Sequence, residues 1–281
     1  MKRITALFLC LIVFISLCGC KKNKSDKKII AVSIVPQATF VEKVCGDNFD
    51  IITMIPPGAS AETYEPTIAE IADLNDASVY FAIGVPAEEN IILPSIDDKD
   101  KIVKLHSAAE EVFPALKIDG ERDPHLWLSP KRVITIVREI ANKLSEIDPD
   151  NADEYRENAE KYCSELSLLD AEITTLLSEK QNRKFIVFHP AFGYFAEDYG
   201  LEMYALEEHG KEADAKHLAK MADMAKDEGI KVIFYQGETS GRQAEAFAEE
   251  IGGKAVELSP LSPDYTENLR LMAKNIAEAI N

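Results

Sequence analysis

The sequence predicts an α/β protein of two lobes, each a mainly parallel sheet with flanking helices, joined by one long spine helix. Two observations support this fold. Short runs rich in β-branched and aromatic residues alternate with helical apolar patterns twice along the 281 residues, which is typical of parallel strands joined by crossover helices. Between the two halves, one uninterrupted apolar stripe at helical spacing predicts a helix longer than the others.

The N-terminal leader is predicted to lie outside the fold. Two basic residues precede an apolar run from Ile4 to Leu17, which has the length of a signal-peptide core and is too short to span a membrane. The run ends in LCGC, which resembles a lipobox. We therefore expect residues 1–19 to be a signal peptide, Cys20 to carry lipid, and residues 20–28 to form a flexible polar tether. The alternative is an ordinary cleaved signal with a chance cysteine.

The N-terminal lobe is expected over residues 29–150. Its strands are predicted where short β-branched runs lie between turn residues, and its helices where apolar residues recur every three or four positions. The expected strands are Ile29 to Ile34, Ile51 to Ile55, Val79 to Ile83 and Ile102 to Leu105, and the expected helices include Ala38 to Val44 and Ile68 to Leu74.

The spine helix is expected over residues 151–182. A helix from Asn151 to Lys180 would be roughly 45 Å long. A coiled-coil dimer would show the same stripe, but the α/β patterns on both sides favour packing against the two lobes of one chain. The stripe consists of Tyr155, Ala159, Tyr162, Leu166, Leu169, Ile173 and Leu176.

The C-terminal lobe is expected over residues 183–281, where the alternation of strands and helices restarts. The strand runs are continuous rather than alternating in polarity, which indicates a parallel sheet buried on both faces. The expected strands are Phe185 to Phe188, Met203 to Leu206, Val232 to Tyr235 and Ala255 to Leu258, and the expected helices are Phe192 to Tyr199, Ala215 to Glu228, Arg242 to Ile251 and Tyr265 to Ile280.

Composition excludes nucleic acid as a partner. Lys and Arg total 31 against 49 Asp and Glu, so the net charge of −18 has the wrong sign for binding a phosphate backbone. The acidity is explained either by a solvated acidic surface or by an attraction for cations. Cys45 and Cys163 are the cysteines of the folded part, and we expect both to be buried thiols without a disulfide.

Two of the five histidines are candidates for metal binding. His189 directly follows the apolar run Phe185 to Phe188, at the carboxyl end of a predicted strand, where open α/β sheets bind ligands. His125 lies in the loop DPHLWLSP. A lone histidine is more often structural, but two at matching places in two lobes indicate one shared cleft. His209 and His217 are expected at the surface or behind the metal ligands.

A third candidate segment is the loop PPGASAETYEPT, which follows the strand Ile51 to Ile55. Its turn residues predict a tight loop at the same edge of the sheet, and the loop presents Glu62 and Glu65. Glu65 precedes a proline and is a candidate for capping or orienting the next helix. Glu62 is therefore the better candidate for a metal ligand.

These segments resemble those of the zinc and manganese solute-binding lipoproteins of ABC uptake transporters, and the zinc type more closely. The GAS-x-x-x-YEPT loop, the DPHLWLSP loop, the HPAFGYFAEDYGL segment and the terminal LSPL occur in family order around a long helix, so the resemblance covers nearly the whole mature chain. In that family, four such segments each lend one ligand to a cation held between two lobes. By position, the resemblance implies Glu62, His125 and His189 as ligands, with Ser259 where a carboxylate is usual.

Coordination chemistry favours Zn²⁺ as the bound ion. Two imidazoles and one or two oxygens suit a tetrahedral zinc site. Mn²⁺ is the alternative, but it prefers more oxygen ligands, and manganese-type relatives tend to carry Glu at the position of His189. Trp127 and Tyr194 are expected to exclude water from the ion. The candidates for the fourth ligand are water, Ser259, Gln236 and Glu208.

The resemblance implies a receptor and not an enzyme. We expect a monomer, anchored by lipid on the extracytoplasmic face of the cell membrane, that binds Zn²⁺ with high affinity and delivers it to an ABC transporter permease. The alternatives are a manganese- or iron-specific member of the same family and a zinc metallohydrolase. A metallohydrolase needs a general base beside the metal-bound water, commonly on an HExxH helix, and the sequence contains no such motif. An adhesin would leave His125 and His189 without a role.

Overall fold

The N-terminal lobe contains a parallel four-stranded sheet in the order β2-β1-β3-β4. The computed structural model describes residues 27–118, 120–207, 214–238 and 241–280. The predicted signal peptide and the lipid site at Cys20 lie outside these residues. The strands are β1 (Ile29–Val32), β2 (Asp50–Thr53), β3 (Val79–Ala82) and β4 (Ile102–Lys104).

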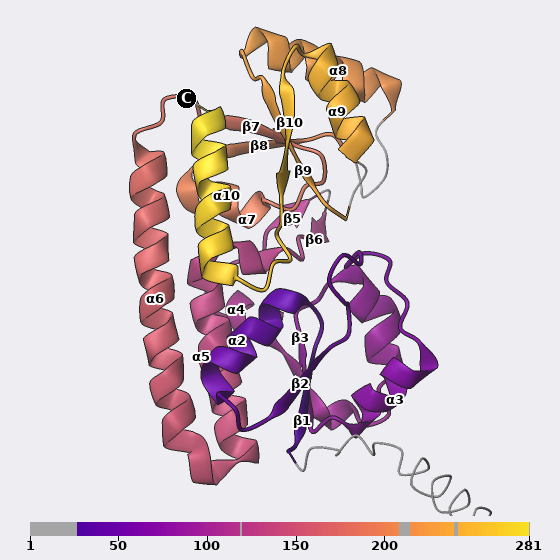
Figure 1. The fold of residues 1–281 in the computed structure, drawn as a ribbon, viewed down its shortest axis with the longest axis vertical. Coiled ribbons are helices and arrows are strands. Elements are labelled where there is room, and N and C mark those ends of the chain that lie inside the picture. Colours follow the sequence, from indigo (N-terminus) through magenta and orange to yellow (C-terminus); the bar gives the residue numbers. More distant parts are fainter. Residues whose placement is uncertain (1–26, 119, 208–213, 239–240, 281) are drawn as a thin grey trace, which may run out of the picture.

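The C-terminal lobe contains a second parallel four-stranded sheet, in the order β10-β9-β7-β8. The eight strands of the two sheets are those that the sequence predicts, with ends that differ by one or two residues. In Figure 1 the two sheets lie one above the other along the long axis, with the carboxyl ends of their strands towards each other. The strands are β7 (Lys184–Val187), β8 (Glu202–Ala205), β9 (Val232–Gln236) and β10 (Lys254–Leu258).

The helices of the N-terminal lobe begin at recognisable sequence signals. Pro36 occupies the first turn of α2 (Val35–Cys45), where proline removes no helical hydrogen bond. Thr67 and Glu70 form a reciprocal capping box at the start of α3 (Ile68–Asp76). The expected strand through Leu105 is one residue too long, because α4 (Leu105–Glu110) begins there. Short helical turns are η1 (Glu88–Ile92), η2 (Leu93–Ser95), η3 (Lys99–Lys101), η4 (Leu126–Leu128) and η5 (Pro149–Asn151).

The predicted spine is α6 (Ala152–Ser178), whose 27 residues correspond to a length of about 40 Å. It lies beside a second long helix, α5 (Pro130–Ile147), and it also packs against α2 and α10 (Tyr265–Ala279; Figure 1). The predicted stripe is buried from Tyr155 to Ile173, and Leu176 is half-buried. The spine therefore contacts elements of both lobes, as expected. The division into 29–150, 151–182 and 183–281 stays a prediction.

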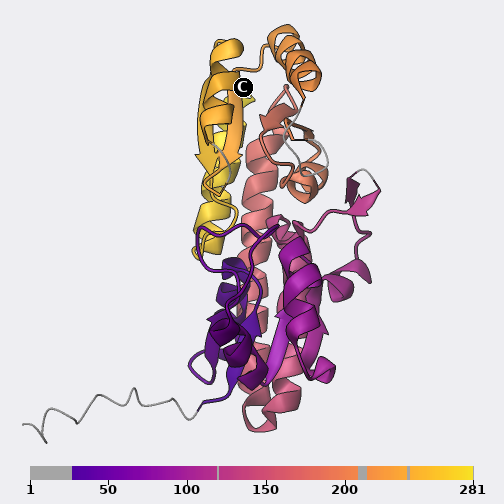
Figure 2. The same ribbon diagram turned by 90° about the vertical axis from the view of Figure 1, so that its right-hand side faces the viewer.

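In the C-terminal lobe, α8 (Ala215–Asp227) and α9 (Gly241–Glu250) pack against β7 and β9 in a second apolar cluster, whereas the other two helices belong to the main core. Figure 2 shows the two lobes stacked along α6. Within the described residues, no helix is long and apolar enough to cross a membrane. The helices are α7 (Gly193–Tyr199), α8 (Ala215–Asp227), α9 (Gly241–Glu250) and α10 (Tyr265–Ala279).

A short antiparallel hairpin, β5 (Lys117–Ile118) and β6 (Glu121–Arg122), precedes the loop that carries His125. The sequence does not predict this hairpin, because two-residue strands are too short to show an alternating pattern. Asp123 N donates to Leu116 O (2.9 Å) directly after the hairpin. The hairpin therefore fixes where the His125 loop begins.

Candidate metal centre

The structure brings Glu62, His125 and His189 together from three segments far apart in the chain. Each offers one ligand atom, and the three atoms lie within 4.8 Å of one another. Glu62 comes from the loop after β2, His125 from the loop before η4, and His189 from the carboxyl end of β7. This convergence is what the sequence predicts, because both sheets present their carboxyl edges to the same cleft.

A buried carboxylate orients His125. The Nδ1 atom of His125 lies 2.8 Å from Asp123 Oδ1, and the backbone N–H of His125 donates to the same oxygen (2.9 Å). The Asp123 side chain is fully buried. A Cβ atom at Gly193, the first residue of α7, would clash with Asp123 Oδ2, so any other residue there would force this carboxylate to shift. Because Nδ1 donates its proton to Asp123, the lone pair of Nε2 is free to bind a metal ion.

A second carboxylate orients His189 in the same way. Glu207, just after β8, places Oε2 2.6 Å from His189 Nδ1. The Nε2 atoms of His189 and His125 lie 3.2 Å apart. Two nitrogens bound to one tetrahedral zinc ion at 2.0–2.1 Å are separated by about 3.3 Å. The two imidazoles are therefore already spaced as ligands of one ion.

Glu62 completes the three-residue cluster. Its Oε1 lies 3.9 Å from His189 Nε2. Its backbone N–H donates to Ser60 Oγ (3.2 Å), and Ala61 O accepts from Ala87 N (3.0 Å), so the loop is held on both sides. Glu65 is exposed and lies outside the cluster. Its suggested role in capping the next helix is wrong, because Thr67 and Glu70 cap α3.

The three residues line a small pocket of about 50 Å³, room for an ion and little more. Gln236, at the end of β9, lines it as one of the expected candidates for the fourth ligand. Ser259 is exposed and does not line it, and Glu208 lies outside the described residues. The lining residues are Ser60, Ala61, Glu62, His125, Trp127, His189, Gln236, Glu238, Pro260 and Leu261.

Glu238 also lines the pocket, although it was not among the ligand candidates predicted from the sequence. Its Oε2 atom is buried and has no hydrogen-bond partner among the described groups. Glu238 follows Gln236 by two residues in the turn after β9. Its position just after the carboxyl end of a central strand could have identified Glu238 as a site residue from the sequence, because the same criterion selects His189.

The two aromatic residues predicted to exclude water differ in their role. Trp127 lines the pocket, with its ring 5.2 Å from that of His125, and its Nε1 donates to Pro260 O (3.0 Å) across the lobes. Tyr194 lies behind the site instead. Its hydroxyl donates to Asp123 O (3.0 Å) and accepts from Leu116 N (3.2 Å), so Tyr194 positions the His125 loop.

The charge of the site favours a cation. Glu62 and Glu238 line the pocket, Asp123 and Glu207 hold the two imidazoles, and no lining residue is Lys or Arg. Carboxylates gathered in a partly buried site without a cationic partner repel one another. A divalent cation between them relieves this repulsion, so the donor set fits a metal ion.

The remaining histidines and the cysteines lie elsewhere. His106 is buried. Its pKa is lowered to about 4, mainly because burial removes the imidazole from water and secondly because of the nearby Arg122 charge. The Nε2 atom of His217 lies 3.1 Å from Ala205 O, and His209 falls outside the described residues. Cys45 and Cys163 are free and buried, as predicted.

Comparison with known proteins identifies the family. The family model of the periplasmic zinc-uptake complex component A, ZnuA, matches residues 30–279. The high-affinity zinc uptake system protein ZnuA of Bacillus subtilis is 29% identical over 259 residues, 86% of this chain and 81% of that protein. The zinc-binding lipoprotein AdcA of Streptococcus pneumoniae is 29% identical over 282 residues. The matched segment is 93% of this chain but only 56% of the longer AdcA.

Solved structures agree with this assignment. The structure of a ZnuA deletion mutant with zinc bound superposes with a TM-score of 0.85 at 36% identity, over 91% of this chain and 99% of that one. The fold of two parallel sheets around a long helix is thus shared with a solved zinc-bound ZnuA. The chain belongs to the ZnuA family of zinc-type solute-binding proteins.

Proposed function

We propose that this protein is an extracytoplasmic receptor that binds Zn²⁺ with high affinity and delivers it to an ABC permease for uptake. The observation that carries the proposal is the pair of imidazoles whose Nε2 atoms lie 3.2 Å apart while carboxylates hold both Nδ1 atoms. Outer carboxylates of this kind fix the tautomer and raise the basicity of zinc-binding histidines. The zinc-type family membership supports the same conclusion.

In this proposal Glu62, His125 and His189 are the protein ligands of the ion. Water takes the fourth position of the tetrahedron, and Glu238, as a lining carboxylate, accepts a hydrogen bond from that water. Two nitrogens and a carboxylate favour Zn²⁺ over Mn²⁺, which prefers a shell richer in oxygen. A bound water is also readily displaced, which suits a receptor that must release its cargo.

The anchoring of the receptor is part of the proposal. Cys20 carries lipid, and residues 20–28 tether the folded part to the outer face of the cell membrane as a monomer. The lipobox-like LCGC sequence supports this anchoring, and AdcA of Streptococcus pneumoniae is itself named a lipoprotein. The protein acts as a receptor and not as an enzyme, and the absence of an HExxH motif supports this role.

Elemental analysis of the purified protein after dialysis against equal Zn²⁺ and Mn²⁺ tests the function. We expect one zinc per chain and little manganese. Manganese at one per chain would instead identify a manganese receptor. Hydrolytic turnover by the zinc-loaded protein would support the metallohydrolase alternative and contradict a receptor role.

A further inference from the structure

Arg132, near the start of α5, is a buried arginine that joins the two lobes close to the candidate metal centre. Its side chain is 5% exposed. Nη1 donates to Asp198 Oδ1 (3.1 Å) and Nη2 donates to Glu197 Oε2 (2.8 Å), and both carboxylates belong to α7 of the C-terminal lobe. Nη1 also donates to the Oγ atom of Ser129 (3.3 Å), which caps α5 and itself donates to Asp198. One guanidinium group therefore binds α7 and the start of α5 at the same time.

Arg132 is linked to His125 through contacts between side chains. Its guanidinium carbon lies 4.4 Å from the centre of the Tyr194 ring on α7, within the range of a cation–π interaction. The Tyr194 hydroxyl donates to Asp123 O (3.0 Å), and the Asp123 carboxylate lies 2.8 Å from Nδ1 of His125. The guanidinium group therefore packs directly on the tyrosine that positions the His125 loop.

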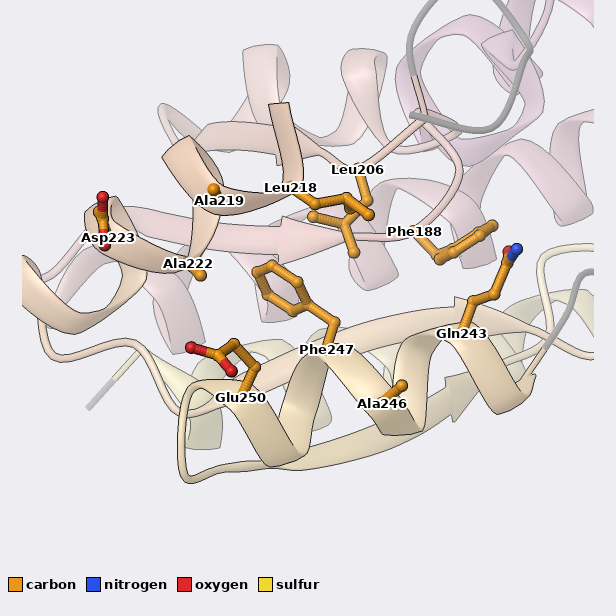
Figure 3. A pocket seen from close by; sticks show the side chains of 10 residues that line it. All are labelled: Phe188, Leu206, Leu218, Ala219, Ala222, Asp223, Gln243, Ala246, Phe247 and Glu250. Carbon is orange, nitrogen blue, oxygen red and sulfur yellow. The ribbon is translucent and has the colours of Figure 1, made fainter. Parts of the chain in front are cut away.

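The strand end that carries His189 is fixed within the C-terminal lobe. Phe188, directly before His189, is buried in the second apolar cluster, where it lines a pocket of about 410 Å³ between α8 and α9 (Figure 3). Its N–H donates to Phe234 O of β9 (2.7 Å), and Ala191 N donates to His189 O (2.8 Å) just before α7. His189 is thus held by the sheet and α7 of this lobe, whereas His125 lies in the loop that leads into α5.

The separation of the two imidazoles therefore depends on how α7 sits against the start of α5. The Nε2 atoms of His125 and His189 lie 3.2 Å apart, close to the separation of about 3.3 Å for two nitrogens on a tetrahedral zinc ion. Cd²⁺ has the same filled d shell as Zn²⁺ but a larger radius, so two nitrogens bound to it lie farther apart. The bonds from Arg132 to α7 oppose such a widening.

We propose that Arg132 is a positioning residue, which holds α7 against the His125 loop and keeps the two imidazoles at a separation that favours Zn²⁺ over the larger Cd²⁺. The holding part stands on the contacts of Arg132 alone, whereas the selectivity part rests on the proposed zinc function. Lysine cannot replace this arginine, because one ammonium group lacks the planar fork that reaches both α7 carboxylates and stacks on Tyr194. Arg132→Lys therefore keeps the charge and removes the fork.

Hydrogen exchange of the metal-free protein, followed by mass spectrometry, tests the holding part. In Arg132→Lys we expect faster exchange than in the wild type over residues 123–129 and 189–199. The matched control is Arg138→Lys on the same helix, because Arg138 is exposed and pairs with Glu160 at the surface. This control should exchange like the wild type in both segments. Wild-type exchange in Arg132→Lys would overturn the holding part.

Competition titrations with Zn²⁺ and with Cd²⁺ test the selectivity part. In Arg132→Lys we expect zinc affinity to fall by about three- to tenfold, no more than when a carboxylate that holds a histidine is replaced. Cadmium affinity should fall less, so the Zn²⁺/Cd²⁺ affinity ratio should decrease. An unchanged ratio would overturn the selectivity part, because a general weakening of the fold lowers both affinities alike. A wild-type protein that binds no zinc would refute the proposed function, while the exchange experiment would still decide whether Arg132 holds the two segments.

A double variant separates the position of the imidazoles from the effect of an unpaired buried charge. The Asp198 side chain is 8% exposed, so Arg132→Gln alone would leave a buried carboxylate without its partner. Arg132→Gln combined with Asp198→Asn removes both charges of this buried pair, and Glu197 is half-exposed to water. We expect the affinity ratio of the double variant to fall as in Arg132→Lys. A wild-type ratio in the double variant would assign the effect to the charge and overturn the positioning role.

Discussion

At the scale of single residues, the site depends on which side chains touch the ion and which hold those side chains. Glu62, His125 and His189 offer ligand atoms within 4.8 Å of one another. Asp123 and Glu207 each bind the Nδ1 atom of one histidine. Replacing a residue that binds the ion should reduce zinc affinity more than replacing a carboxylate that only holds a histidine.

Glu62 and Glu65 form a matched pair in one loop. Glu62→Gln replaces an anionic ligand by a weak neutral donor, so we expect zinc affinity to fall by about a hundredfold. Glu65 is exposed and outside the cluster, so Glu65→Gln should leave zinc affinity unchanged. Competition titration against a zinc chelator measures both variants. A loss confined to Glu65→Gln would mean that the loop presents its other carboxylate to the ion.

Replacement of the supporting carboxylates should give an intermediate loss. Asp123→Asn and Glu207→Gln keep the shape of each side chain but weaken the hydrogen bond to Nδ1. We expect a decrease in zinc affinity of about tenfold, smaller than that of Glu62→Gln, with one zinc still bound per chain. The same chelator titration, with circular dichroism to check the fold, measures it. Wild-type affinity in both variants would show that these carboxylates do not support the ligands.

Glu88 gives a prediction about pH and stability that is separate from the metal. Burial raises the pKa of Glu88 from its ordinary 4.5 to about 7, against the opposing hydrogen bonds from Ser33, Tyr80 and the N–H groups of Ile83 and Gly84. Between these two pH values the folded chain keeps a proton that the unfolded chain has lost. The contribution of Glu88 to the free energy of unfolding therefore falls as pH rises, by about 3 kcal/mol at most.

The variant Glu88→Gln cannot titrate at this position. Its free energy of unfolding, measured by urea denaturation of metal-free protein, should fall less than that of the wild type between pH 4.5 and pH 7. The slopes are compared rather than the absolute values, because the glutamine NH₂ group would face backbone donors. Parallel pH profiles for the two proteins would contradict the raised pKa of Glu88.

At the scale of helices and strands, regular patterns could be predicted and short or irregular ones could not. The eight parallel strands and α6 follow from continuous apolar runs and from one long stripe. The β5–β6 hairpin has strands of two residues, too short for any period. The carboxylates of Asp123 and Glu207 were missed because their role depends on which histidine nitrogen they reach in space.

The spine helix offers a test with a built-in control. Leu166 is fully buried on α6, whereas Leu168, two residues on, is 66% exposed. Leu166→Ala should lower the free energy of unfolding by about 2–5 kcal/mol, because it leaves a cavity, and Leu168→Ala should change it by less than about 0.5 kcal/mol. Urea denaturation measures both. Equal effects would mean that the stripe is not the buried face.

At the scale of the whole molecule, α6 contacts helices of both lobes, and the candidate metal centre lies where the carboxyl ends of the two sheets face each other. Ties across this junction include Trp127 Nε1 to Pro260 O (3.0 Å) and the Tyr265 hydroxyl to Trp127 O (2.7 Å). Arg132 of α5 also pairs with Glu197 and Asp198 of α7. The lobes are thus joined beside the ion as well as along the spine.

X-ray absorption spectroscopy at the zinc edge, on protein loaded with one equivalent of Zn²⁺, tests the central claim most directly. We expect four nitrogen or oxygen neighbours at about 2.0–2.1 Å, with the outer-shell scattering of two imidazoles and no sulfur. His125→Ala and His189→Ala should each remove one imidazole from the spectrum. A wild-type spectrum without imidazole scattering, or one left unchanged by both substitutions, would place the zinc site elsewhere in the protein.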